Sequence, residues 1–380
     1  MLGKYSEVLR KLTTSIEPQL PNSPFRRIMP GTPRKELSAN LDLLRTIAVM
    51  SVFFDHLLGV LHNPSFGSLG RFGVIIFFVH TSFVLMGSLH RLEKTAGSDH
   101  ALAIGFWIKR IFRIYPLSIV LVVSIVAFHI LAAPDQIYLW SGWRVFLSNL
   151  ALSQNLVYCN NLLTPLWSLP LEVQMYFLLP FAYFVIRGKP RYRSLALWLL
   201  SVLLALTIPR KILPLSVFLY APCFISGIVA YDLIRSKRWT WKLPAWVWPI
   251  GIFVLIALFG PHDNIAIWHK MHRAWGLSLL LGVLYANVEE MPSNWMHQIF
   301  HWIADRSYGI YLSHKVVFWI VFYRMEQFPL WVKLPALIAG SIGIPALLYT
   351  FLERPLIQVG SRLAKRYLES SATRKTYDPA

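Results

Sequence analysis

The stretch Leu41–Leu61, LDLLRTIAVMSVFFDHLLGVL, is apolar and long enough to cross a bilayer, which takes about 20 residues. It nevertheless carries Arg45 and His56, and a charged side chain at the centre of a spanning helix costs about 2.5–3.5 kcal/mol or more. Because the two residues are eleven apart, an α-helix places them on one face, about 16 Å apart along the axis. We expect Arg45 near the membrane surface and His56 near mid-depth. Ionisable groups inside a span are usually functional.

The same stretch holds two carboxylates. Asp42 lies three residues before Arg45 and suits the positive end of the helix dipole at a helix start. Asp55 points about 100° away from His56, and we expect it to pair with another helix.

The composition of the whole chain is that of a polytopic membrane protein. Of its 380 residues, 56% are hydrophobic and 14% are charged, whereas soluble domains are about 25% charged. The net charge of +19 does not indicate a nucleic-acid partner, because the basic residues are spread over the ends of apolar segments. Cys159 and Cys223 fit neither a disulfide framework nor a metal spacing, so we expect no metal site.

After the opening stretch we predict nine more spans, which gives an all-α membrane protein with about ten transmembrane helices. The nine are 70–89, 115–133, 167–187, 194–208, 212–234, 246–260, 272–288, 307–324 and 331–352. The segments 194–208 and 246–260 are short for a span, and 142–157 is polar enough to be interfacial or re-entrant. A basic tail (1–40) precedes the membrane domain (41–358), and another (359–380) follows it.

The distribution of Lys and Arg predicts the orientation of these spans. With the N-terminus in the cytoplasm, ten spans return the C-terminus there, and 27 of the 37 Lys and Arg residues fall on the cytoplasmic side, against eight in outer loops. Such a bias is typical of the positive-inside rule. We therefore expect both termini to be cytoplasmic, with Arg45 at the cytoplasmic mouth of the bundle.

A second cationic feature is FWIKRIFRIYPL, which leads into the predicted span 115–133. Arg110 and Arg113 are three residues apart and therefore neighbours on a helix, and paired guanidinium groups can bind phosphate bidentately. The alternative is an anchor for lipid headgroups. Arg45 at the same membrane face favours a shared anion site, because two helices then direct cations to one mouth.

Polar residues recur in two later spans. In WSLPLEVQMYFLLP, Glu172 lies just inside a span, Tyr176 follows one turn later, and Trp167 and Ser168 precede them. An intramembrane carboxylate normally has a partner or a polar cavity, although an interfacial Glu facing solvent is an alternative. In SYGIYLSHKVVFW, the residues Tyr308, Tyr311 and His314 recur every three positions and share one helix face. That face suits a polar substrate or a hydrogen-bond relay, or else forms a packed aromatic seam.

Two further motifs complete the pattern. The stretch GRFGVIIFFVHTSF combines small residues with His80 and would allow close helix approach. In FLERPLI, Glu353 and Arg354 are adjacent, which by itself predicts the end of a span with a local ion pair.

Taken in this order along a ten-span chain, these motifs resemble the acyltransferase-3 family of integral-membrane O-acyltransferases, over residues 41 to about 360. The resemblance implies an acyl-CoA donor, with acetyl-CoA as the expected form, and a sugar, glycan or other hydroxyl acceptor. It implies His56 as the catalytic base, Arg45 as its companion, Arg110 and Arg113 as the basic pair, and Glu172 as the glutamate of the WS…E…FY element. It also implies the bacterial inner membrane as the location.

A mechanism follows as a hypothesis. Arg45, Arg110 and Arg113 would bind the CoA phosphates, and the pantetheine arm would extend toward His56. Glu172, counted with His56 and Arg45 as catalytic, would orient or deprotonate the acceptor hydroxyl together with His314. Acceptor-binding or orienting roles would fall to residues of the two later spans, Trp167, Ser168, Tyr176, Tyr308, Tyr311 and His314. No bound cofactor is expected. The alternative function is a secondary transporter that uses intramembrane His and Glu relays, although no internal repeat is visible.

Overall fold

The computed structural model describes residues 38–61, 68–130, 142–188, 192–207, 216–236, 241–260 and 267–377. The predicted N-terminal tail therefore lies outside the described residues, apart from its last three positions. The described part is helical, with a single isolated bridge between Leu243 and Val288. Its helices are α2 (Ala39–Val60), α3 (Leu69–Glu93), α4 (Asp99–Phe128), α5 (Gly142–Leu150), α6 (Leu169–Ile186), α7 (Arg193–Thr207), α8 (Val217–Arg235), α9 (Val247–Phe259), α10 (Ile267–Ala286), α11 (Trp295–Phe318), α12 (Leu330–Leu348) and α13 (Arg354–Tyr377).

Six helical segments of the described chain are long and apolar enough to cross a membrane, which makes the chain an integral membrane protein. They are Ala39–Val60, Leu69–Glu93, Asp99–Phe128, Thr164–Ile186, Val217–Arg235 and Leu330–Thr373. Helices α7 and α9 are apolar but shorter, as the sequence predicted. The count of ten spans and the orientation of the termini stay predictions.

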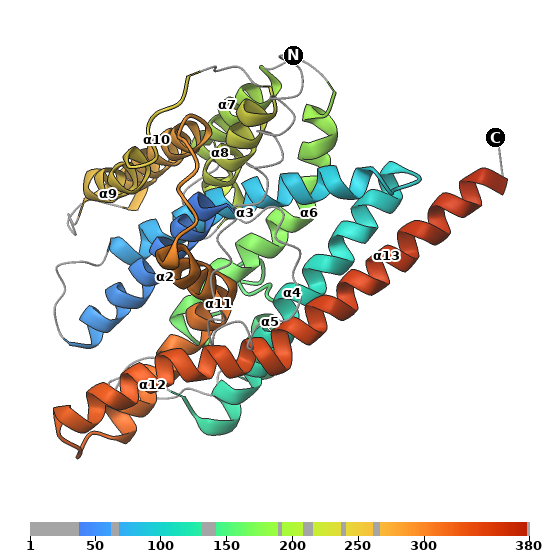
Figure 1. Cartoon of the computed structure of the whole chain (residues 1–380). Helices are drawn as coiled ribbons and strands as arrows, with labels where there is room; N and C mark the ends of the chain where they lie inside the picture. The colour runs from blue at the N-terminus through green and yellow to red at the C-terminus, as the bar shows by residue number, and fades with distance from the viewer. Residues whose placement is uncertain are drawn as a thin grey trace, which may run out of the picture. The chain divides into compact units, whose positions relative to one another are not determined.

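Helices α2 and α3 lie side by side in the interior, and a glycine sets their separation (Figure 1). A Cβ atom placed on Gly73 would come within 2.6 Å of the Ala48 carbonyl oxygen of α2. No side chain larger than hydrogen fits there unless the helices move apart. The expected close approach through the small residues of α3 is confirmed. Lipid supplies no hydrophobic drive for helix pairing, so such dispersion contacts hold the pair together.

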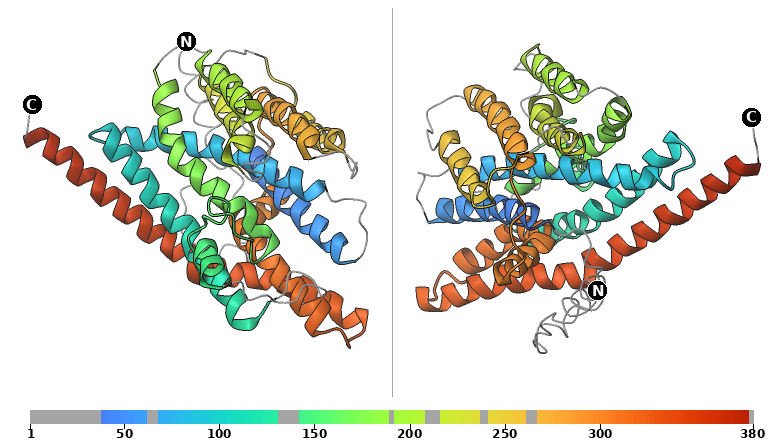
Figure 2. Two further views of the ribbon diagram at one scale, coloured as in Figure 1. Left: turned by 180° about the vertical axis from the view of Figure 1, so that it is seen from behind. Right: turned by 45° about the horizontal axis from the view of Figure 1, so that its top comes forward.

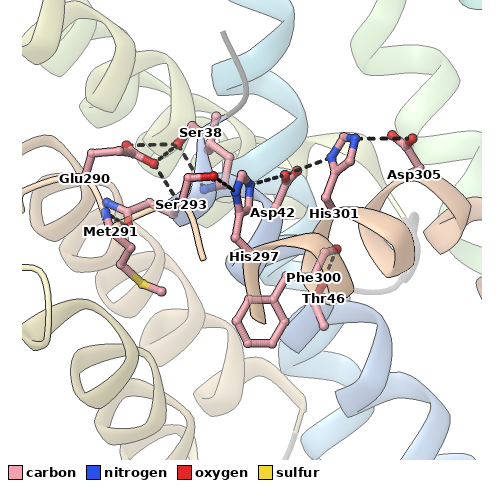
Figure 3. Close-up of polar contacts among 12 residues, drawn as sticks. Ser38, Asp42, Thr46, Glu290, Met291, Ser293, His297, Phe300, His301 and Asp305 are labelled. Atoms are coloured by element: carbon pink, nitrogen blue, oxygen red, sulfur yellow. Dashed lines mark hydrogen bonds and ion pairs between the residues drawn. The ribbon is translucent and has the colours of Figure 1, made fainter. Parts of the chain in front are cut away.

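Helix α11 also packs against α2, and a part-buried polar network joins the two helices. One oxygen of Asp42 is 3.1 Å from His297 Nε2 and 3.0 Å from His301 Nδ1, both on α11. Figure 3 shows the Asp42 carboxylate between the two imidazoles. Ser38 caps α2 by accepting a hydrogen bond from the Leu41 amide. Asp42 therefore does more than favour the helix start, because it ties α2 to α11.

The C-terminal segment is a helix rather than an irregular tail. One turn of π-helix, η5 (Tyr349–Glu353), joins α12 to α13, and α13 continues to Tyr377. Figure 1 shows α13 running alongside α4, and Figure 2 shows the same pairing from two other directions. The helices meet closely, since a Cβ on Gly360 would lie 2.5 Å from the side chain of Phe112. The predicted division at residue 359 thus falls inside one continuous helix.

Candidate functional site

A cavity of about 100 Å³ opens among α2, α3, α4, α6 and α11. Its lining brings together Arg45, His80, Thr81, Val84, Leu85, Arg110, Arg113, Ile114, Glu172, Tyr176 and Tyr308. A second cavity of about 60 Å³ shares Arg45, Thr81, Glu172 and Tyr308 with the first, and adds Ser168 and Tyr311. Residues that the sequence assigned separately to donor and acceptor binding therefore line the first cavity together.

Two of the three arginines at this cavity have spare donors. The Nε atoms of Arg45 and Arg110 are buried and have no hydrogen-bond partner in the described part of the chain. A buried donor without a partner costs about 1–3 kcal/mol, and more when the group is charged. The two guanidinium groups come from different helices, α2 and α4, and line the same space. Such an arrangement is suited to an anionic ligand.

The third arginine is already paired. Arg113 Nη1 donates to Glu353 Oε2 at 3.0 Å, and the side chain of Glu353 is 1% exposed. The expected local ion pair between Glu353 and Arg354 is therefore wrong: Glu353 faces α4, while Arg354 is exposed. The π-helical turn that ends at Glu353 places this residue against the interior, and such turns often occur at functional sites. Arg113 also lies over the ring of Tyr308, 5.6 Å from its centroid.

The carboxylate of Glu172 lies at the start of α6, directly after a short 3-10 helix, η3 (Thr164–Ser168). The hydroxyl of Tyr176, one turn later, donates to Glu172 Oε1. Glu172 faces the arginine cavity, so its expected polar environment is confirmed and the solvent-facing alternative is not.

The aromatic residues expected to contact the acceptor have different surroundings in the structure. Tyr308 lines both cavities and donates to the Ile114 carbonyl at 2.6 Å. Tyr311 lines the second cavity, where its hydroxyl is 2.8 Å from Ser168 Oγ. Trp167 lines neither cavity; its ring packs against Tyr220 of α8, with centroids 5.5 Å apart. A direct acceptor contact for Trp167 thus has no support in this arrangement.

The two histidines of α2 and α11 that the sequence singled out lie in contact. His56 Nδ1 is 2.7 Å from His314 Nε2. Since α2 ends at Val60, His56 lies one turn from the end of the helix, and its expected position near mid-depth of the bilayer stays a prediction. His56 is part-exposed and lines neither cavity. Tyr311 connects the two regions, because it lines the second cavity and its ring centroid is 6.3 Å from that of His314.

Sequence reasoning missed two residues at this site. His80 on α3 is 7% exposed and lines the first cavity, but the sequence singled it out only as part of a stretch of small residues. The available signal was an ionisable residue in the middle of a span. Glu353 is the second, and its partner on α4 is 240 residues away. Its place at the end of a span made a local partner the simpler interpretation.

A family model described as an acyltransferase domain, Acyl_transf_3, matches residues 38–350. The chain belongs to the acyltransferase-3 family. The match covers every residue named at the two cavities and at the histidine pair except Glu353, which lies just beyond it.

Curated relatives of this acyltransferase-3 chain are bacterial O-acetyltransferases. It is 24% identical to the peptidoglycan O-acetyltransferase OatA of Listeria monocytogenes over 84% of its own length and 56% of that protein's. It is 25% identical to a putative O-acetyltransferase of Staphylococcus aureus, over 88% and 58%. The putative peptidoglycan O-acetyltransferase YrhL of Bacillus subtilis is 24% identical, over 86% and 56%. The chain thus spans little more than half the length of these relatives. No solved structure matches it.

Proposed function

We propose that this acyltransferase-3 chain is a membrane O-acyltransferase that moves an acyl group, acetyl in the first instance, from cytoplasmic acyl-CoA to a hydroxyl of a sugar or glycan. The single observation that carries the proposal is the cavity at which Arg45 and Arg110 present buried Nε atoms that have no hydrogen-bond partner among the described residues. A CoA moiety supplies the anionic phosphates that such a site binds. Two relatives are named as an established and a putative peptidoglycan O-acetyltransferase, so a peptidoglycan sugar is the first acceptor to test.

The path from donor to base follows α2. Arg45 and His56 share one face of this helix, about 16 Å apart along its axis. The pantetheine arm of a CoA held at Arg45 can extend over such a length. The second cavity, which Phe77 and Tyr311 line, begins this path on the Arg45 side. With the cytoplasmic N-terminus that the charge distribution predicts, His56 lies toward the outer end of α2, so the acyl group alone crosses the bilayer.

At the reaction site, His56 takes the proton of the acceptor hydroxyl as its oxygen attacks the thioester carbonyl carbon. A C–O bond forms, the C–S bond breaks, and the proton passes from His56 to the departing thiolate, giving CoA as the thiol. Removing such a base typically costs about 10²–10⁴-fold in rate. We place the enzyme in the bacterial inner membrane, where acyl-CoA is available at the cytoplasmic face and a glycan acceptor at the outer face.

The test is acetyl-CoA-dependent O-acetylation by purified protein at matched levels. His56→Ala is expected to lower turnover at least 10²-fold, whereas His100→Ala, which changes an exposed histidine on α4, leaves turnover near the wild-type value. Near-normal turnover in His56→Ala would remove His56 from the mechanism.

A further inference from the structure

The contact between His56 and His314 has a geometry that suits a directed hydrogen bond. Their ring planes differ by 11°, with centroids 5.0 Å apart, and the two facing nitrogens are 2.7 Å apart. Nearly coplanar rings direct the N–H of one imidazole along the lone pair of the other. The two residues are 258 positions apart in the chain, so the close packing of α11 on α2 creates the pair.

The second nitrogen of His314 determines which way this hydrogen bond runs. His314 Nδ1 is 3.2 Å from the Ile310 carbonyl oxygen, one turn back on α11. A carbonyl can only accept, so Nδ1 carries the hydrogen, and the Nε2 of a neutral His314 is left with a lone pair. His56 must then donate from Nδ1 to His314 Nε2. The lone pair of a neutral His56 therefore resides on Nε2, the nitrogen that faces away from His314.

Packing keeps His314 away from any substrate. Its exposure is 2%, and it lines neither cavity. The rings of Phe53 and Phe318 lie 6.3 and 5.5 Å from it, centroid to centroid, on two different helices. His56 is more exposed than His314. Of the two imidazoles, His56 is the one that an acceptor hydroxyl can reach.

We propose that His314 is a positioning residue that fixes His56 in the Nδ1–H tautomer, so that Nε2 of His56 accepts the proton of the acceptor hydroxyl. This inference rests on the proposed function of His56 and replaces the acceptor-binding role that the sequence suggested for His314. When Nε2 takes the proton, His56 becomes an imidazolium, and its Nδ1–H continues to donate to His314. The hydrogen bond therefore orients the base before transfer and stabilises its charged form during transfer.

Three variants test the hydrogen bond apart from packing. His314→Phe fills the aromatic site but removes the acceptor for His56 Nδ1–H, whereas His314→Gln retains an acceptor oxygen. Phe318→Leu disturbs the ring packing around His314 and leaves the nitrogen pair in place. His314→Phe is expected to lower kcat about 10²-fold with KM for acetyl-CoA and for the acceptor changed less than twofold. His314→Gln should regain at least tenfold over His314→Phe, and Phe318→Leu should stay within threefold of wild type.

The outcomes separate this inference from the proposed function. If His56→Ala is inactive while His314→Phe keeps near-normal kcat, the positioning role fails and the base assignment stands. If His56→Ala itself is near normal, the proposed function of His56 fails. Equal losses in His314→Phe, His314→Gln and Phe318→Leu, with matching losses of thermal stability, would show that His314 only supports packing, and would overturn the proposal.

Discussion

Arg110 and Arg113 are one helical turn apart on α4, yet their surroundings differ. Arg113 forms an ion pair with the buried Glu353, while the Nε of Arg110 has no hydrogen-bond partner among the described residues. Breaking a buried ion pair costs about 3–5 kcal/mol, because the remaining charge stays buried and unpaired. The arginine pair that the sequence treats as one unit is thus divided: Arg110 is available to a ligand, and Arg113 is already engaged with the protein.

This difference predicts separate effects for two matched variants. Arg110→Met is expected to raise KM for acetyl-CoA about 10–100-fold, the equivalent of one charged hydrogen bond, and to leave KM for the acceptor unchanged. Arg113→Met is expected to lower the thermal midpoint of the purified protein, because it leaves Glu353 unpaired. Steady-state kinetics and thermal unfolding in detergent measure the two effects. A rise in acceptor KM without a rise in donor KM for Arg110→Met would remove Arg110 from the donor site.

At the scale of elements, the position of α2 depends on its two neighbours, α3 and α11. On the α3 side, Gly73 meets the backbone of α2 at Ala48, three residues after Arg45. On the α11 side, Asp42 joins His297 and His301. Both contacts lie within one turn of Arg45, so they fix the part of α2 that carries the proposed donor cation.

Gly73→Ala is expected to destabilise the protein by about 1–3 kcal/mol, because the added methyl group meets a backbone oxygen that cannot move without its helix. Activity should fall with it, since Arg45 is displaced. Gly276→Ala on α10 is the control, because beyond its own stretch of helix no atom of the described residues lies within 4 Å of a Cβ at that position. Thermal unfolding of the purified proteins measures both. A Gly73→Ala protein as stable as Gly276→Ala would contradict the close α2–α3 contact.

His301 lies before the stretch 307–324 that is predicted to cross the membrane. The titration of its imidazole leads to a second prediction about how α2 and α11 hold together. The hydrogen bond to the Asp42 carboxylate is the largest influence on the His301 imidazole and raises its pKa. Burial and the charge of Arg306 lower this pKa, the charge of Asp305 raises it, and the net shift is upward. The folded state therefore favours the protonated form. Its contribution to stability is full below the unfolded pKa of about 6.5 and is lost as pH rises through the higher folded-state pKa.

The wild-type thermal midpoint should accordingly fall as pH rises above about 6.5, through the raised folded-state pKa. His301→Gln should flatten this dependence, and His100→Gln, at an exposed position on α4, should preserve it. Differential scanning measurements across the pH range provide the comparison. An identical slope in the wild type and His301→Gln would show that this pair does not couple folding to pH.

Across the whole molecule, the sequence predicted which segments are helical far better than which residues meet. Apolar helices can be predicted from the length and hydropathy of one local segment. The close α2–α3 contact could likewise be predicted from the small residues of a single segment. The pairs Arg113–Glu353 and His56–His314 join residues more than 200 positions apart. Such contacts depend on which helices become neighbours, and that arrangement is not encoded in the spacing of any single motif.

The start of the helix that carries Arg110 and Arg113 differs from the predicted span for a related reason. Helix α4 begins at Asp99, well before the predicted span at 115, because Ser98 caps its first turn there, and it packs against α13. Hydropathy locates the apolar part of a helix, whereas caps and neighbouring helices decide where the helix stops.

The central claim, acyl transfer rather than transport, is tested most directly by reconstituting the purified protein in proteoliposomes. Acetyl-CoA with a labelled acetyl group is supplied at the face that carries the N-terminus, with a peptidoglycan fragment at the other face. We predict acceptor-dependent release of CoA, in a one-to-one ratio with acetyl groups bound to the glycan, and loss of both in His56→Ala. Passage of the acceptor or of acetyl-CoA across the bilayer without CoA release would contradict the account and favour a transporter.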